Sequence, residues 1–154
     1  MGKDHKMEQD AIITVSLVLY LNSIEEITTV IKSTLCSGSV QKMFLIDNSP
    51  TEELGVLKNI DSEIIEYCFQ NKNLGFGAAH NIALNLANRL NSTFHIIVNP
   101  DISFKANVIP ELTKKMESDQ EIGLLMPKII YPTGLNQFLC KLLPEPKDLI
   151  FRRF

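Results

Sequence analysis

Residues 12 to 21 read IITVSLVLYL, a nearly continuous apolar run that is rich in β-branched residues. Such a run is typical of a strand buried on both faces, as in parallel sheets that are covered by helices. Just beyond it, Ser23 stands three residues before Glu26, which is the capping-box signature of a helix start. Apolar residues then recur at helical spacing until Ser37-Gly38-Ser39. The sequence therefore predicts a buried strand followed by an amphipathic helix.

The same alternation continues along the chain. Further strands are predicted at residues 43–47 (MFLID), 64–69 (IIEYCF), 94–98 (FHIIV) and 122–130 (IGLLMPKII, bent at Pro127), and helices at 51–59, at 79–90 and from about 106, where Val108, Leu112 and Met116 are expected to face inward. Alternating strands and helices indicate an α/β fold with a mainly parallel central sheet. Because parallel crossovers are right-handed, helices are expected on both faces of the sheet.

The composition excludes several classes of protein. The chain has 154 residues, 45% of them hydrophobic and 21% charged, which suits one soluble compact domain. Its net charge of −3 does not mark the whole chain as a nucleic-acid binder. The 3 cysteines are far apart and show no metal-binding spacing, which favours a reducing, cytoplasmic setting. No apolar run approaches the ~20 residues that span a bilayer.

Three segments are distinguished by composition. Residues 1–10 are polar and are expected to form a flexible lead-in, and residues 11–132 hold the alternating strands and helices. Residues 133–154 read as loop and short helix and end in FRRF. We expect FRRF to pack against further protein sequence rather than to bind a membrane, since two arginines add only about 2 kcal/mol of attraction to an anionic leaflet. Any membrane contact is then peripheral.

Polar residues follow each of the first four predicted strands. They are Tyr20 and Asn22; Asp47, Asn48 and Ser49; Asn71, Asn73, Gly75 and Gly77; and Asn99 and Asp101. In open α/β sheets, ligands bind beyond the carboxyl ends of the strands, so these groups are candidates for a nucleotide site. Turns favour Asn, Asp, Ser and Gly for their own reasons, and that interpretation stays open.

The segment Asn99-Pro100-Asp101 has two interpretations of its own. Its side-chain oxygens are hard ligands that, together with the phosphates of a ligand, can hold Mg²⁺ or Mn²⁺. Alternatively, the three residues form an Asx turn that merely reverses the chain. Taken alone, the tripeptide favours the turn.

The glycine-bearing loop at residues 71–81 does not fit a dinucleotide-binding motif. Gly75 and Gly77 give G-x-G, but His80 stands where the third glycine is required, and the loop follows the third strand. The glycines are expected to permit unusual backbone angles at a helix entry, whose N-terminus can help to hold an anion. His80 is a candidate ligand contact at this junction, whereas His95 is expected to be packed within its strand.

Taken together, four segments carry a family resemblance. They are VSLVLYLN (15–22), FLIDNS (44–49), NKNLGFGAAHNIAL (71–84) and IIVNPDI (96–102). In this order and spacing they resemble the family 2 glycosyltransferases of the Rossmann-like GT-A fold, and most closely the bacterial rhamnosyltransferase-type members that build cell-surface polysaccharide. The resemblance covers roughly residues 12 to 150, and it implies that the chain holds the donor-binding half, with residues 133–154 as a tail or the start of the acceptor region.

The resemblance implies transfer of a sugar, usually with inversion, from a UDP- or dTDP-linked donor to a glycan or lipid-linked glycan at the inner face of the membrane. The residues implied at the donor nucleotide are Leu19, Tyr20, Asn22, Asp47, Asn48, Asn73, Gly75, Gly77, His80 and Asn81. Asp101, with Asn99, would occupy the place of the family's D-x-D and hold Mg²⁺ or Mn²⁺. There the metal neutralises charge that builds on the leaving diphosphate.

Two positions depart from the family pattern, and one group is missing. Asn99 replaces the first acid of D-x-D, which weakens the expected metal affinity, and Leu21 stands where a tyrosine is expected. No acid motif after Asp101 offers a catalytic base. Two other functions therefore remain as alternatives: a non-catalytic nucleotide-sugar-binding or assembly module, which could form a homodimer, and a sugar nucleotidyltransferase. The second is disfavoured because residues 20–23 are not a glycine-rich phosphate loop.

Overall fold

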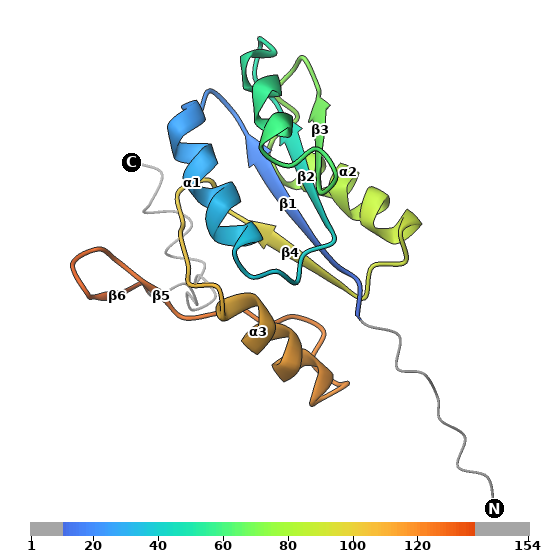
Figure 1. Ribbon diagram of the computed structural model, residues 1–154, viewed down its shortest axis with the longest axis vertical. Helices are drawn as coiled ribbons and strands as arrows, with labels where there is room; N and C mark the ends of the chain where they lie inside the picture. Colours follow the sequence, from blue (N-terminus) through green and yellow to red (C-terminus); the bar gives the residue numbers. More distant parts are fainter. Residues whose placement is uncertain (1–10, 138–154) are drawn as a thin grey trace, which may run out of the picture.

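A computed structural model describes residues 11–137, and its centre is a four-stranded sheet in the order β3-β2-β1-β4 (Figure 1). The strands are β1 (Ile13–Leu19), β2 (Lys42–Asp47), β3 (Ile65–Phe69) and β4 (Phe94–Val98). All neighbouring strands are parallel. The predicted α/β class and the first four predicted strands are confirmed. The predictions for residues 1–10 and for FRRF lie outside the described residues.

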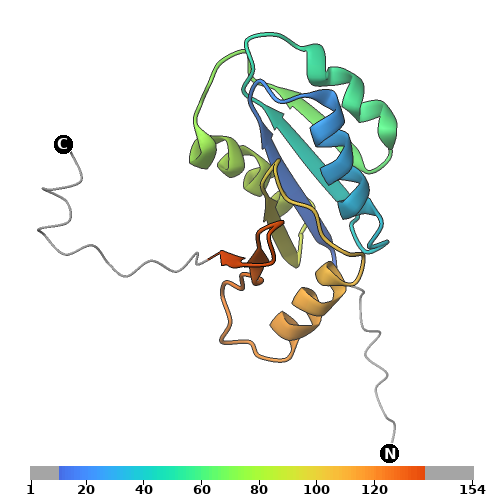
Figure 2. The same cartoon turned by 90° about the vertical axis from the view of Figure 1, so that its left-hand side faces the viewer.

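Helices cover both faces of this sheet, as expected. Helix α1 (Ile24–Leu35) and the 3₁₀ helix η1 (Glu53–Ile60) lie on one face, and helix α2 (Phe76–Arg89) lies on the other (Figure 2). The segment predicted as a helix at 51–59 thus forms a helix, but of the 3₁₀ type and at Glu53–Ile60. Helix α3 (Val108–Glu117) follows β4. No helix in residues 11–137 is long and apolar enough to cross a bilayer.

The start of α1 follows from its sequence. The Ser23 hydroxyl accepts a hydrogen bond from the backbone N–H of Glu26 at 3.2 Å, as the capping-box signature predicts. Beyond the helix, Gly38 has a φ of 67°, a left-handed conformation that glycine adopts without steric cost. Both ends of the predicted helix are thus set by local residues.

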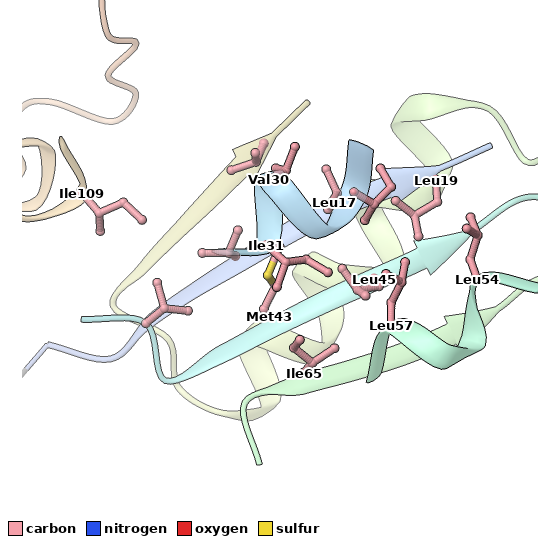
Figure 3. Packing of buried hydrophobic residues seen from close by; sticks show 14 of the residues in the cluster. Leu17, Leu19, Val30, Ile31, Met43, Leu45, Leu54, Leu57, Ile65 and Ile109 are labelled. Atoms are coloured by element: carbon pink, nitrogen blue, oxygen red, sulfur yellow. The ribbon is translucent and has the colours of Figure 1, made fainter. Parts of the chain in front are cut away.

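The main hydrophobic core lies between the sheet and the α1–η1 layer. Alternate residues of β1 point into it, and Leu17 and Leu19 are fully buried there. They pack with Ile31 of α1, Leu45 of β2 and Leu57 of η1 (Figure 3). Fully burying a side chain of this size stabilises the fold by about 1.5–3 kcal/mol, so this layer provides most of the stability.

The opposite face of the sheet carries a smaller cluster. Ala79, Ala83 and Ala87 of α2 pack on Phe44 and Ile46 of β2. Alanine side chains allow the helix to lie close to the strands. On the same face, β1 presents two polar residues instead of apolar ones, Thr14 and Ser16, and both are fully buried.

Two sequence predictions for the C-terminal part of the described chain were wrong. Residues 122–130 do not form a buried strand: Leu124 is 89% exposed, and only Ile129–Ile130 (β5) forms a strand, which pairs antiparallel with Asn136–Gln137 (β6). The apolar composition of this stretch suggested burial, but Pro127 lacks the N–H that a central strand needs.

The inward face of α3 also differs from the prediction by one residue. Ile109 and Thr113 are its buried residues, whereas Val108, Leu112 and Met116 are only half-buried. Ile109 reaches the edge of the main core (Figure 3).

Candidate functional site

The carboxyl ends of all four strands of the main sheet meet around one cavity of about 520 Å³. This volume is within the usual range for small-molecule sites. The lining residues are Val18, Tyr20, Asn22, Asn48, Asn73, Gly75, Phe76, Asn99, Pro100 and Asp101. β1 has β2 on one side and β4 on the other, so the cavity lies where the strand order changes direction, which is the usual ligand position in open α/β sheets.

The loop after β1 is held in a strained conformation. Leu21 has a φ of 55°, a left-handed value that a branched side chain rarely adopts. Its backbone N–H donates to the Ser49 hydroxyl at 3.0 Å, and the N–H of Tyr20 donates to Oδ1 of Asn22 at 2.9 Å. These bonds fix the loop so that Tyr20 and Asn22 border the cavity. Strain of this kind is characteristic of binding loops.

The loop between β3 and α2 contributes a second wall. Oδ1 of Asn73 accepts from the N–H of Gly75 at 2.9 Å, and Gly75 has a φ of 79°. A residue with a Cβ would be strained there, which confirms that this glycine serves the helix entry. α2 begins at Phe76, which lines the cavity, so the positive end of the helix dipole lies beside the cavity. No side chain caps this end of the helix.

The turn after β4 forms the third wall. Asn99 and Asp101 are both exposed, and Pro100 lies between them in the lining. The segment is a turn and also borders the cavity, so its two interpretations are compatible. Asp101 is the one charged side chain among the lining residues. Phosphates bound here would therefore need a cation from elsewhere.

The same turn can be tested for its fit to a divalent metal. Asn99 and Asp101 offer two oxygen-bearing side chains on one wall of the cavity. Within residues 11–137, no cluster of three or more His, Cys, Asp or Glu forms a complete protein site. The donor set fits an ion such as Mg²⁺, which usually takes one or two carboxylates and completes its shell with waters and ligand phosphates.

Five of the residues implied by the family resemblance do not line the cavity. They are Leu19, Asp47, Gly77, His80 and Asn81. For Leu19 and Asp47 the reason is the alternation of side chains along a strand. Leu19 packs into the main core, whereas its neighbour Val18 lines the cavity. Gly77 and Asn81 are exposed on α2 without reaching the lining.

Asp47 is instead part of a buried hydrogen-bonded group. One carboxylate oxygen accepts from the Tyr67 hydroxyl at 2.5 Å, and the other accepts from the backbone N–H of Ser49 at 2.8 Å. Burial, together with the hydrogen bond to Asp47, raises the pKa of Tyr67 far above its usual value, so this hydroxyl stays a donor. In this structure Asp47 shapes the turn after β2 rather than facing the cavity.

His80 is also buried, with 2% of its surface exposed. Its Nδ1 lies 2.8 Å from the Ser16 hydroxyl, and burial lowers its pKa. His95, on β4, contacts Thr14 and Ser16 through its two ring nitrogens, as its expected packed role requires.

The sequence interpretation missed Val18 as a lining residue. It also did not single out Phe76 and Pro100, which lie within the loop and the turn that it assigned to the site. Phe76 is the most informative, because 56% of this large aromatic side chain is exposed at the cavity. The available signal was its position between two glycines at a helix entry, where an aromatic ring has few neighbours to bury it.

Comparison with solved structures supports the fold. S. aureus TarS residues 1–349 superpose with a TM-score of 0.58 at 17% identity, over 71% of this chain and 33% of that fragment. The same TarS fragment solved with UDP gives a TM-score of 0.58 at 18% identity and the same coverage. The complex with UDP-GlcNAc gives 0.57 at 17% identity, covering 71% of this chain and 32% of that one.

The chain has a GT-A-like fold, which it shares with this part of TarS. At this level of identity the likeness shows the fold alone, and the chain spans about one third of the length of the TarS fragment that it matches. No family model matches the sequence, and no curated protein matches it either. The expected fold class is confirmed, whereas the rhamnosyltransferase subgroup stays a prediction.

Proposed function

We propose that residues 11–137 form the donor-binding part of a nucleotide-sugar glycosyltransferase. The observation that carries this proposal is the cavity itself, which is walled by the residues that follow all four parallel strands. Two solved structures with the same fold contain UDP or UDP-GlcNAc. The ligand we propose is a UDP- or dTDP-linked sugar. The finer assignment, to a rhamnosyltransferase-type enzyme that supplies a cell-surface glycan or a lipid-linked glycan, rests on the four sequence segments.

The charge of the cavity supports a metal-assisted mode of binding. A nucleoside diphosphate brings at least two negative charges into a cavity whose lining includes Asp101 and no Lys or Arg. Without a cation, this juxtaposition would be repulsive. Mg²⁺ or Mn²⁺ held by Asp101 and Asn99 would remove the repulsion and, when bound, stabilise the leaving diphosphate.

Asn48 is the residue best placed to select the base. Its Nδ2 lies 3.5 Å from the Gly75 carbonyl, whereas its Oδ1 is buried without a hydrogen-bond partner among the described residues. Flipping the amide would bring two oxygens together, so the oxygen is the free group. Uracil and thymine carry an N3–H that would satisfy this acceptor once ligand binding uncovers it, whereas cytosine has no hydrogen at N3. We therefore expect UDP and dTDP to bind more tightly than CDP, as measured by calorimetry.

The decisive test of the proposed function is the Asp101→Ala variant. We expect UDP binding by the unchanged chain in the presence of Mn²⁺, and a loss of tenfold or more when Asp101 is replaced, since a ligand charge and its metal are lost. Calorimetric titration with and without Mn²⁺ measures the effect. Glu117→Ala, at the exposed end of α3, is the matched control because it removes the same charge away from the cavity.

Two outcomes would contradict this proposal. The first is the absence of UDP and dTDP binding to the unchanged chain at millimolar concentration, with Mn²⁺ or Mg²⁺ present. The second is Mn²⁺-dependent binding that is equal in Asp101→Ala and Glu117→Ala, which would make Asn99-Pro100-Asp101 only a turn.

A second candidate is a module that binds a nucleotide sugar without transferring it. One observation favours it: among the cavity lining, no carboxylate other than Asp101 is available to deprotonate an acceptor hydroxyl. This candidate predicts tight UDP-sugar binding with no release of UDP during incubation with glycan acceptors. A coupled assay for free UDP separates the two functions.

A further inference from the structure

A continuous chain of hydrogen bonds runs through the buried side of the sheet that faces α2. It joins five side chains in the order Ser92, Thr14, His95, Ser16 and His80, with successive donor–acceptor distances of 2.8 Å. Thr14 and Ser16 are fully buried, and His80 is 2% exposed. The chain therefore links β4, β1 and the first turns of α2 within the protein interior.

The direction of the protons in this chain is set at its first member. The Ser92 hydroxyl has one proton, and it donates it to backbone carbonyls, that of Phe94 at 2.8 Å and that of Ile12 at 3.2 Å. Thr14 must then donate to Ser92, and the Nδ1–H of His95 must donate to Thr14. The opposite direction would leave the Ser92 oxygen and the Phe94 carbonyl in contact without a proton between them.

The same reasoning continues through the two imidazoles. Burial, with a further effect from His80, lowers the pKa of His95 to about 4, so its ring is neutral near pH 7. With a proton on Nδ1, its Nε2 accepts from the Ser16 hydroxyl. Ser16 has then used its proton, so the Nδ1–H of His80 donates to Ser16. The Nε2 of His80 is left as a buried acceptor without a hydrogen-bond partner among the described residues.

This order fixes both the tautomer and the orientation of the His80 ring. The ring meets Phe76 edge-on, with centroids 4.3 Å apart and an interplanar angle of 68°. Edge-to-face aromatic pairs at such distances are favourable. Phe76 lies one turn earlier on α2 and lines the cavity, so the series of hydrogen bonds ends at a side chain that contacts the cavity wall.

We propose that His80 is a positioning residue, held by Ser16 and His95, that keeps Phe76 in the wall of the cavity and so tunes nucleotide affinity. Its effect on affinity rests on the proposed function, whereas its effect on Phe76 does not. His80 need not touch the ligand. This assigns to His80 a supporting role in place of the direct nucleotide contact that the family resemblance implies.

The first test is the tautomeric state of the two histidines in the complete chain. Long-range ¹H–¹⁵N NMR near pH 7.5, without nucleotide, is expected to show a protonated Nδ1 and a bare Nε2 in both His80 and His95. A protonated Nε2 in either ring would overturn the proposed order. Ser16→Ala is expected to abolish the Nδ1 preference of His80 and to weaken the nuclear Overhauser contacts between His80 and Phe76.

The second test is UDP affinity in a matched set of variants. Ser16→Ala keeps the imidazole but removes its anchor, His80→Phe keeps an aromatic ring but loses the donor, and His80→Asn keeps a donor but loses the ring. Each is expected to bind UDP about three- to tenfold more weakly, the scale of one lost hydrogen bond or aromatic contact. Ala87→Gly, further along α2, is the control for general destabilisation and is expected to bind normally.

The outcomes separate this proposal from the proposed function. If the unchanged chain binds no nucleotide, the proposed function fails, and the His80–Phe76 contacts in Ser16→Ala still decide the positioning role. If UDP binds and all three variants bind as tightly as Ala87→Gly, the positioning role is wrong. Should Ser16→Ala not fold, the tautomers of the unchanged chain and the His80→Asn variant decide the matter.

Discussion

The two faces of the central sheet differ in what they contribute. On the α1–η1 face, β1 presents an unbroken row of apolar residues that build the main core. On the α2 face, the same strand presents Thr14 and Ser16, which are tied into an interior hydrogen-bond chain. Apolar packing is tolerant of geometry, whereas hydrogen bonds require particular distances and directions. The α2 face, where hydrogen bonds fix the side-chain positions, is also the face that borders the cavity. Val18 of β1 and Phe76 of α2 both line the cavity on this side.

The largest expected effect is on the free energy of unfolding, and it is seen by comparing neighbouring residues of β1 that lie on the two faces. Leu17→Ala removes a fully buried side chain from the main core and is expected to lower the free energy of unfolding by about 2–5 kcal/mol. Val18→Ala, on the cavity side, removes a half-buried side chain and should cost clearly less stability. Chemical denaturation measures both. UDP affinity should change in Val18→Ala and stay normal in folded Leu17→Ala, and the reverse pattern would contradict the division between the faces.

Acid should weaken the polar face of the sheet through its two histidines. The pKa of His95 is lowered to about 4 by burial and by His80, and burial lowers that of His80 as well. Because the unfolded chain binds these protons more readily, stability is complete above about pH 6.5, the ordinary histidine pKa, and falls as the pH drops towards 4. His95 has the larger shift and is expected to contribute more of this loss than His80, although solvent screening of its partly exposed ring reduces the effect.

Urea denaturation at pH 7.5, 6, 5 and 4.5 measures this loss, and carboxylate titration must be subtracted. Replacing His95 with glutamine, which does not titrate, supplies the reference. An equal acid-induced loss in that variant and in the unchanged chain would show that His95 is not responsible.

A smaller effect is expected from two glycines at the entry of α2. Gly75 has a φ of 79°, so Gly75→Ala should cost about 1–2 kcal/mol of stability and distort the Asn73 side of the cavity. Gly77 lies within the helix, and a Cβ there would meet nothing within 4 Å, so Gly77→Ala should stabilise by about 0.5–1 kcal/mol. Thermal unfolding measures both, and a similar sign in the two variants would refute this assignment.

Much of the fold could be predicted from the sequence because its signals are local. The apolar run at 12–21, the serine cap at Ser23 and the periodicity of the later helices each depend on nearby residues. The gathering of Asn22, Asn48, Asn73 and Asp101 around one cavity followed from a general property of parallel sheets.

The rest of the site depends on facts that a single sequence does not contain. Successive side chains of a strand point to opposite faces of the sheet, so a shift of one residue in register would bring Leu19 to the cavity in place of Val18. The exposure of residues 122–130 depends on whether another element covers them, which their composition does not reveal. The interior chain brings together Ser16 and His95, which are 79 residues apart and look unremarkable within their own strands.

The placement of β4 beside β1 has a consequence for how the molecule folds. β1, α1, β2 and β3 can assemble from segments that are close in the sequence, but β4 must cross back over the intervening chain to pair with β1. Contacts between such distant segments form slowly, because loop closure precedes the energetic gain. We therefore expect docking of β4 to be a late step. Since β4 supplies His95 and leads to Asp101, a nascent chain would have the part of its main core that β1, α1, β2 and η1 build before it had a binding site.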